Sequence, residues 1–259
     1  MTVVRNSNWT ITTILVYIIL FIAFCIEYLL HYRFVNGVCP NLNEKQKSYI
    51  LSIKSSLAML LVGIYFNYHY LTSKLDPTSF FDNLSNLGSI DFGKIVLLYF
   101  TAYLVMDIYI GSREYSDQMK SLSGYFHHTV YTLINLLALN IGIFPMYFLH
   151  MLSELPTLIL SVGSFNSNLR DDNLFGITFF FTRILYHIFL TYVFRHNTIV
   201  LSLSLATLGM HIYWFSGWVK KYFLAPKEIT SEKEQIPKVT KVTKKKKSKK
   251  INKTNKTIN

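Results

Sequence analysis

The chain has 259 residues, of which 51% are apolar, and it carries a formal net charge of +12. Its mean hydropathy is +0.30. The apolar residues fall in blocks close to the ~20 residues that cross ~30 Å of hydrocarbon, which argues against an ordinary soluble domain. The chain has two cysteines, Cys25 inside the first apolar block and Cys39 in the loop after it. A disulfide framework is therefore not expected.

The basic charge is concentrated at the C-terminus. Residues 225–259 hold twelve lysines against three glutamates, so about +9 of the +12 lies there. A charge carried by one polar segment does not predict a nucleic-acid-binding domain. It indicates a disordered, solvated tail that is attracted to anionic lipid headgroups.

The first apolar block runs from Trp9 to Leu30 and contains one acidic residue, Glu27. It is too long for the apolar region of a cleaved signal peptide, so we expect a retained first span. The expected spans are 9–30, 49–70, 93–110, 125–142, 144–163, 174–194 and 198–222. The predicted fold is therefore an all-α, multi-pass transmembrane helical bundle of about seven spans. Its parts are a first span and loop (1–48), a helical membrane domain (49–224) and the tail (225–259).

Orientation follows from the placement of lysine and arginine. A basic tail stays in the cytosol, and seven spans then place the 31–48 loop, with Lys45 and Lys47, in the cytosol too. The 71–92 loop carries more acidic than basic residues and falls on the far side. Asn83 opens an Asn-Leu-Ser sequon in that loop and would be a lumenal glycosylation site.

Polar residues recur at helical spacing inside five of the expected spans. They form one stripe per helix: Tyr99, Tyr103 and Asp107; His128, Tyr131 or Thr132, and Asn135; His150, Glu154, Thr157 and Ser161; Thr178, Thr182 or Arg183, and His187; Ser204, Thr207, His211, Trp214 and Trp218. A charged group in the middle of a bilayer costs about 2.5 to 3.5 kcal/mol on insertion scales. We therefore expect the stripes to converge on one interior, where Asp107, Glu154 and Arg183 neutralise one another. Single Ser and Thr residues also join helices without any chemistry.

Several of these segments resemble the TLC domain. The landmarks are Tyr125-Phe126-His127-His128, Ser153-Glu154-Leu155-Pro156-Thr157, Tyr103 to Asp107 (YLVMD), Phe180 to Ile184 (FFTRI) and His211 to Phe215 (HIYWF). They occur in the family's order across residues 49 to about 224. The resemblance implies a lipid-handling helical bundle of the endoplasmic reticulum or a related endomembrane, whose partners are membrane lipids.

The best-understood enzymes of this family are ceramide synthases, which join a sphingoid base to acyl-CoA. Their signature pairs adjacent histidines with a His-Asp-x-Ser-Asp run. This chain keeps His127, His128, His150 and Ser153, but has Met151 for the first aspartate and Glu154 for the second. Lys54 and the serines after it stand where relatives often carry a histidine. A histidine oriented by a carboxylate suits the proton transfer or acyl transfer of amide formation.

Three functions follow as alternatives. The first is a TLC protein without synthase activity that binds, senses or transports membrane lipids. The second is a ceramide-synthase-like N-acyltransferase with acyl-CoA as a substrate, which requires His128 and Glu154 to face one cavity. The third is a seven-span receptor or transporter, although no paired inverted repeat is evident. No cofactor or metal site is expected.

The candidate site residues follow from the resemblance and the stripes. If the protein is an enzyme, the catalytic candidates are His127, His128, His150, Glu154 and Asp107. The cavity-lining or lipid-binding candidates are Lys54, Tyr103, Thr157, Arg183, His211 and Trp214.

Overall fold

The computed structural model describes residues 10–74, 79, 89–120 and 122–224, and all regular structure among them is helical. The Asn83 sequon and the lysine-rich tail lie outside the described residues. The helical elements are α1 (Ile11–Val38), α2 (Glu44–Lys47), α3 (Ile50–Ser73), α5 (Ser89–Glu114), α6 (Ser116–Met119), η1 (Leu122–Phe126), α7 (His127–Ile141), α8 (Phe144–Leu149), η2 (His150–Ser153), α9 (Glu154–Phe165), η3 (Ser167–Leu169), α10 (Asp172–Phe179), η4 (Phe180–Leu185), α11 (Tyr186–Val193), α12 (Thr198–Val219) and η5 (Lys220–Leu224).

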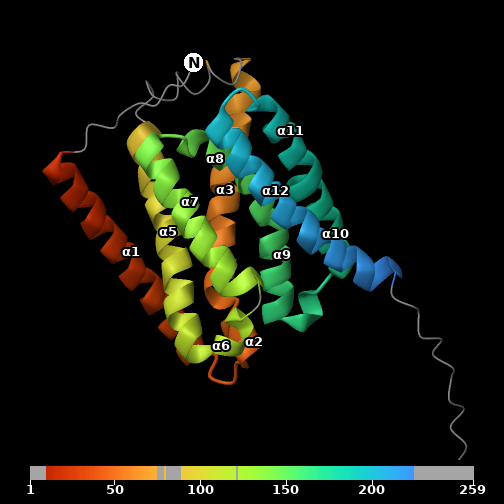
Figure 1. Cartoon of the computed structure of the whole chain (residues 1–259). Helices are drawn as coiled ribbons and strands as arrows, with labels where there is room; N and C mark the ends of the chain where they lie inside the picture. The colour runs from red at the N-terminus through yellow and green to blue at the C-terminus, as the bar shows by residue number, and fades with distance from the viewer. Residues whose placement is uncertain (1–9, 75–78, 80–88, 121, 225–259) are drawn as a thin grey trace, which may run out of the picture.

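Six helical stretches of the described chain are long and apolar enough to cross a membrane: Ile11–Val38, Glu44–Ser73, Phe92–Glu114, Tyr147–Phe165, Asp172–Val193 and Thr198–Leu224. This confirms the predicted all-α, multi-pass architecture. The expected span at 125–142 corresponds to α7, which has 15 residues. At 1.5 Å per residue α7 is about 22 Å long, less than the ~30 Å hydrocarbon core. It nevertheless runs beside α5 along the bundle (Figure 1).

Short polar residues begin several helices, as their chemistry predicts. The Thr10 hydroxyl accepts from the Thr13 amide at the start of α1. Asp171 accepts from the Asn173 and Leu174 amides at the start of α10, and Asn197 caps α12. At the other end of α7, Gly142 adopts a left-handed conformation (φ 75°) that favours glycine and ends the helix.

Two spans contain an irregular segment that carries a polar residue, His150 in one and Arg183 in the other. Before α9, residues His150–Ser153 form a tighter 3₁₀ turn. Pro156 cannot donate an amide hydrogen to the carbonyl of residue 152, which accounts for the departure from α-helical bonding there. In the following span, Phe180–Leu185 form a π-helical segment, η4, between α10 and α11. Both irregular segments lie at the depth of the polar residues and orient them.

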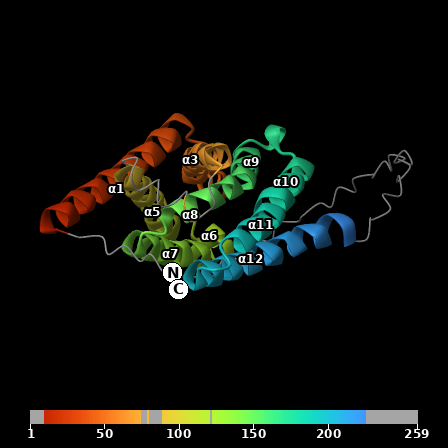
Figure 2. The ribbon, with the colours of Figure 1, turned by 90° about the horizontal axis from the view of Figure 1, so that it is seen from above.

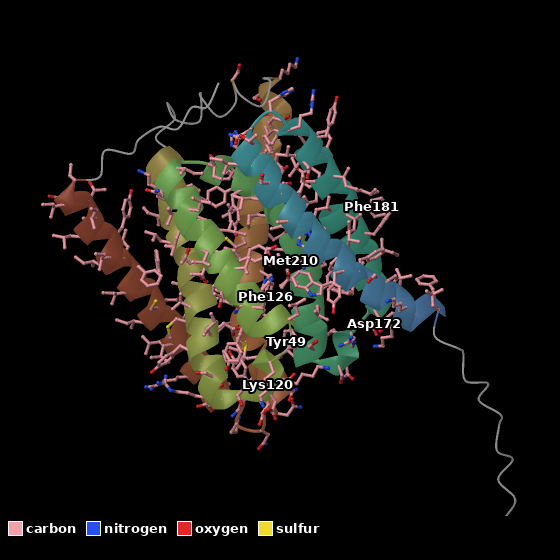
Figure 3. All side chains as sticks on the ribbon, viewed as in Figure 1. Tyr49, Lys120, Phe126, Asp172, Phe181 and Met210 are labelled. Atoms are coloured by element: carbon pink, nitrogen blue, oxygen red, sulfur yellow. The ribbon has the colours of Figure 1, made fainter. Side chains whose placement is uncertain are left out.

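The bundle has an outer helix and a packed centre. α1 lies at the edge, where it packs on α5 and α3 (Figure 2). α3 packs on η2 and α9, while α12 packs on α10, η4 and α11. Large apolar side chains, Phe181 among them at 58% exposure, point outward over the surface of the bundle (Figure 3). An outer surface of this kind suits contact with lipid rather than water.

Two helix contacts require glycine because the backbones or rings approach closely. A Cβ on Gly63 of α3 would lie 2.8 Å from the backbone nitrogen of Leu152. A Cβ on Gly176 of α10 would lie 2.0 Å from Cζ2 of Trp218 in α12. These contacts hold η2 against α3 and the end of α12 against α10, and so fix the helices that carry the polar residues.

Several connections share one end of the bundle. The Gln46 amide of α2 donates to the Phe165 carbonyl at the end of α9 (2.9 Å), and Lys47 pairs with Glu114 at the end of α5 (3.6 Å). The Trp218 indole near the end of α12 donates to the Asp172 carbonyl at the start of α10 (3.1 Å). The 39–49 connection and the C-terminal end of α12 therefore lie on the same side. We call this the α2 end.

Candidate functional site

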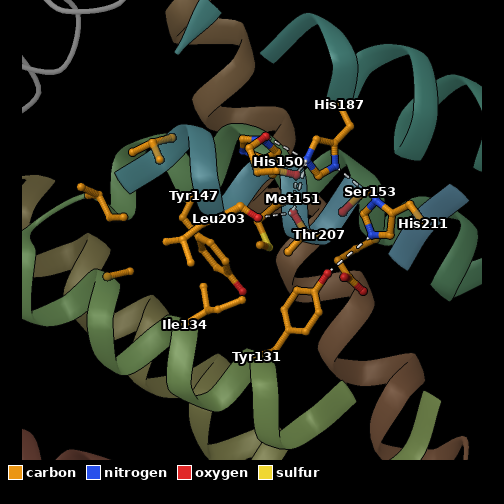
Figure 4. A pocket seen from close by; sticks show the side chains of 15 residues that line it. Tyr131, Ile134, Tyr147, His150, Met151, Ser153, His187, Leu203, Thr207 and His211 are labelled. Atoms are coloured by element: carbon orange, nitrogen blue, oxygen red, sulfur yellow. Dashed lines mark hydrogen bonds between the residues drawn. The ribbon is translucent and has the colours of Figure 1, made fainter. Parts of the chain in front are cut away.

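A pocket lies between α7, the η2–α9 segment, α11 and α12 (Figure 4). Its cavity volume is about 70 Å³. One wall is apolar and comes from α7, the α7–α8 connection and the first turns of α12: Ile134, Ala138, Ile143, Val200 and Leu203. The other wall carries hydrogen-bonding groups: His150, Glu154, His187, Ser204, Thr207 and His211. The pocket is thus amphipathic across its width.

Two tyrosines stand between these walls. Tyr131 of α7 points toward His211, and Tyr147 lies beside Leu203 (Figure 4). The Tyr131 hydroxyl is 3.5 Å from His211 Nε2, at the limit of a hydrogen bond. The buried Tyr147 hydroxyl oxygen has no hydrogen-bond partner among the described residues. Each tyrosine can therefore donate a hydrogen bond to a molecule in the pocket.

His187 is held by oxygen atoms of its own helix and of α12. Its Nε2 lies 3.0 Å from the Ser204 carbonyl oxygen, 3.0 Å from Ser204 Oγ and 3.3 Å from Thr207 Oγ1. A carbonyl oxygen only accepts, so we assign the hydrogen to His187 Nε2. Ser204 Oγ in turn lies 2.5 Å from Thr191 Oγ1, which donates to the His187 carbonyl.

The neighbouring imidazole of His211 has the complementary tautomer. Its Nδ1 lies 3.2 Å from the Arg183 carbonyl oxygen, in the π-helical segment, and 3.2 Å from His187 Nδ1. Because the carbonyl accepts, the hydrogen is on His211 Nδ1, and His187 Nδ1 shares it as an acceptor. The lone pair of the neutral His211 is then on Nε2, the nitrogen nearest Tyr131 (Figure 4).

The Arg183 side chain joins α9 to the π-helical segment. Its Nε donates to the Ser153 carbonyl (2.8 Å), and its Nη2 donates to Thr157 Oγ1 (2.6 Å). The same Nη2 lies 3.9 Å from the Glu154 carboxylate. The guanidinium and the carboxylate offset each other's charge inside the bundle, as their positions in the sequence predict. Glu154 also lines the pocket.

The expected single interior is instead divided into two polar groups. The second group lies between α5 and α7, where Asp107 Oδ2 is 3.2 Å from His128 Nδ1. Both side chains are almost fully buried, Asp107 at 3% and His128 at 6% exposure. Tyr103 stands beside His128 and hydrogen-bonds to Ser52 of α3 (3.0 Å). Asp107 therefore pairs with His128 and does not join Glu154 and Arg183.

Tyr115 completes this second group from the turn between α5 and α6. Its hydroxyl donates to Asp107 Oδ1 (2.6 Å). Burial, with the nearby Asp107 carboxylate, raises the pKa of the Tyr115 hydroxyl, so it stays protonated and acts as the donor. Both carboxylate oxygens of Asp107 thus have a partner.

The adjacent histidines of α7 point in different directions because successive residues on a helix are about 100° apart. His128 faces α5. His127 stacks near Tyr131 (4.4 Å between ring centroids) and meets Trp214 of α12 edge to face (5.3 Å). Trp214 also lies beside His211. His127 and Trp214 thus close the gap between α7 and α12 on the α2 side of the pocket, and His128 does not line it.

Lys54, expected in the cavity, is placed elsewhere. Its ammonium pairs with the Glu27 carboxylate of α1 and lies 5.1 Å from the centroid of the Tyr28 ring. Glu27 and Lys54 therefore neutralise each other at the interface of α1 and α3. Lys54 is not among the residues that line the pocket, since a lysine inside a span pairs with a nearby carboxylate.

The sequence-based list of site residues omits several polar side chains that line the pocket: Tyr131, Tyr147, Ser153, His187, Ser204 and Thr207. The stripe of the sixth span did contain His187, and that of the seventh contained Ser204, so their signal was present. Tyr147 had no such signal, because its position depends on the 3₁₀ turn that follows it. In the described part of the chain, no cluster of three or more His, Cys, Asp or Glu side chains is placed to hold a metal ion.

Comparisons with protein-family models, with curated proteins and with solved structures give no match to this chain. The fold and the site by themselves define the class of protein: a multi-pass helical integral membrane protein with an amphipathic pocket among its spans.

Proposed function

We propose that this protein is a TLC-type membrane protein that binds a membrane lipid in the pocket between α7, η2–α9, α11 and α12, and thereby senses or transports that lipid. The observation that carries the proposal is a pocket among the spans in which apolar side chains gather on one side and hydrogen-bonding groups on the other (Figure 4). A lipid has the matching division into chain and headgroup, and a pocket of this kind fixes a ligand's orientation with few polar groups.

The test is to purify the protein in detergent and identify the co-purified lipids by mass spectrometry. Leu203→Trp places a large ring in the pocket, whereas Leu205→Trp places the same ring on the exposed side of α12, where Leu205 is 52% exposed. We expect one lipid class to co-purify with the wild type and with Leu205→Trp, and to fall to background with Leu203→Trp. Equal lipid content in all three proteins contradicts the proposal.

The acyltransferase alternative requires His128 and Glu154 to face one cavity. His128 pairs with Asp107 and does not line the pocket, so the geometry favours binding over amide formation. Purified protein supplied with a sphingoid base and labelled acyl-CoA is accordingly expected to form no ceramide. No separate observation favours a receptor, and transport of the bound lipid is part of the proposal above.

The proposed orientation places the α2 end and the lysine-rich tail in the cytosol. The described basic residues toward that end include Arg33, Lys45, Lys47, Arg113, Lys120, Arg170, Lys220 and Lys221, whereas Lys74, Lys94 and Arg195 lie toward the other end. Cytosolic ends of membrane proteins are enriched in Lys and Arg, which supports this orientation. Residence in the endoplasmic reticulum and binding of anionic headgroups by the tail belong to the same proposal.

A further inference from the structure

The hydrogen bonds around His211 limit which headgroup the pocket accepts. His187 donates through Nε2 and accepts through Nδ1, and His211 donates through Nδ1. Each imidazole thus uses one nitrogen as donor and one as acceptor, which is the neutral form. The only acceptor position left on this pair is His211 Nε2, which faces Tyr131.

The charged groups beside the pocket already offset one another. Arg183 Nη2 lies 3.9 Å from the Glu154 carboxylate and is hydrogen-bonded to Thr157. Glu154 is the one carboxylate among the described lining residues, and Arg183 already offsets its charge, so an ammonium or phosphate headgroup would add a charge that finds no unpaired counter-charge there. A lone charge at membrane depth is costly, which disfavours both kinds of headgroup.

The remaining groups match a hydroxyl. His211 Nε2 can accept a hydrogen bond, and the hydroxyls of Tyr131 and Tyr147 can donate one. At 3.5 Å the Tyr131–His211 hydrogen bond is weak, so a ligand oxygen lying beside both atoms can accept from Tyr131 and donate to His211. An alcohol has one donor and two acceptor positions, whereas an ammonium only donates and a carboxylate only accepts.

We infer that the pocket selects an uncharged lipid whose headgroup presents a hydroxyl, and that His211 is the residue that determines this specificity. The Arg183 carbonyl and His187 position His211 by fixing its tautomer. This inference rests on the proposed lipid-binding function and names the class of lipid.

The test uses three ligands with one oleyl chain and different headgroups: oleyl alcohol, oleylamine and oleate. Displacement of tritiated oleyl alcohol from the purified full-length protein measures their relative affinities. We expect oleyl alcohol to bind about tenfold more tightly than either charged analogue. A difference of this size corresponds to the loss of about one or two hydrogen bonds between the headgroup and the pocket. Tighter binding of the amine or of the acid overturns the inference.

The residue assignment is tested with His211→Phe, which keeps a ring and removes the acceptor, and with His196→Phe at an exposed loop position as the matched control. We expect His211→Phe to abolish the preference for the alcohol and His196→Phe to retain it. If His211→Phe does not fold, Tyr131→Phe removes the neighbouring hydroxyl and is expected to weaken alcohol binding several-fold. An unchanged preference in the folded variant overturns the assignment.

The two proposals fail in different ways. If a lipid co-purifies and is lost with Leu203→Trp, but it is charged or the alcohol shows no advantage, the pocket still binds lipid and only the headgroup assignment is wrong. If Leu203→Trp changes no lipid, the binding function itself is wrong.

Discussion

Asp107 Oδ2 lies 3.2 Å from His128 Nδ1, and neither side chain reaches the pocket. The carboxylate also accepts from Tyr115, so this group joins α5, α7 and the turn before α6. Its position between helices, with the Tyr115 hydroxyl and the His128 ring on the two oxygens of Asp107, indicates that it stabilises the bundle.

We therefore expect Asp107→Leu to destabilise the protein by about 3 to 5 kcal/mol, because it leaves His128 and Tyr115 buried without their partner. The double variant Asp107→Leu with His128→Leu should recover part of that loss. Unfolding in detergent, followed by circular dichroism, measures both. A single variant within about 0.5 kcal/mol of the wild type would exclude this stabilising role.

The pair of Glu27 and Lys54 is expected to hold α1 against α3. Glu27→Leu leaves Lys54 unpaired at membrane depth and should destabilise the contact by about 1 to 3 kcal/mol. Lys54→Leu together with Glu27→Leu should cost less than Glu27→Leu alone. Cys25 of α1 is a free cysteine, so its rate of alkylation reports separation of α1. Equal rates in the two variants would argue against the pair.

Gly176 is expected to tolerate no side chain, because a Cβ there would lie 2.0 Å from the Trp218 ring. Gly176→Val should destabilise the protein by about 1 to 3 kcal/mol through overpacking. Gly209→Val is the matched control, since a Cβ at Gly209 meets no atom within 4 Å. Melting temperatures of the two variants test the contact, and it is refuted if both are equally stable.

The orientation is testable with a native thiol. Cys39 is free and lies in the connection between α1 and α2. In sealed microsomes with the cytosolic face outward, a membrane-impermeant maleimide should label Cys39 without detergent, with Cys39→Ser as the control. A cysteine placed at Lys74 in the Cys39→Ser protein should be labelled only after detergent is added. The opposite pattern would reverse the orientation.

The same orientation predicts glycosylation of Asn83. An enzyme that removes N-linked glycans should increase the mobility of the wild-type protein on a gel and leave Asn83→Gln unchanged. A wild-type protein without glycan would remove this support for a lumenal 71–92 loop.

The sequence was sufficient for the helical architecture because apolar block length determines what can cross a bilayer. It was also sufficient for the approach of Arg183 to Glu154, because charges in spans require partners. It placed His128, and not His127, on the polar stripe of the fourth span, but it grouped the two as catalytic candidates although neighbouring residues on a helix point in different directions. It did not predict the pairing of Lys54 with Glu27 of α1. That contact depends on which helices pack together, and the spacing of polar residues along one helix does not reveal this.

The other differences arise from backbone irregularities. The 3₁₀ turn at His150–Ser153 and the π-helical segment at Phe180–Leu185 change the direction of the side chains that follow. Simple helical spacing therefore placed the polar stripes on the correct helices but could not decide which residues meet. The imidazoles of His187 and His211 come within 3.2 Å of each other because η4 packs against α12.

The π-helical segment η4 determines how the span Asp172–Val193 responds to the loss of one residue. A π-helical turn accommodates one residue more than the α-helical turn it replaces. Losing a single residue between Phe180 and Leu185 would leave an apolar span of nearly the same length, still able to insert. Because the π-helical turn already holds one additional residue, the shortened segment can close as a regular α-helical turn that keeps the direction of α11 relative to α10. The same deletion within α10 or α11, where the turns are α-helical, would instead turn His187 by about 100° away from His211.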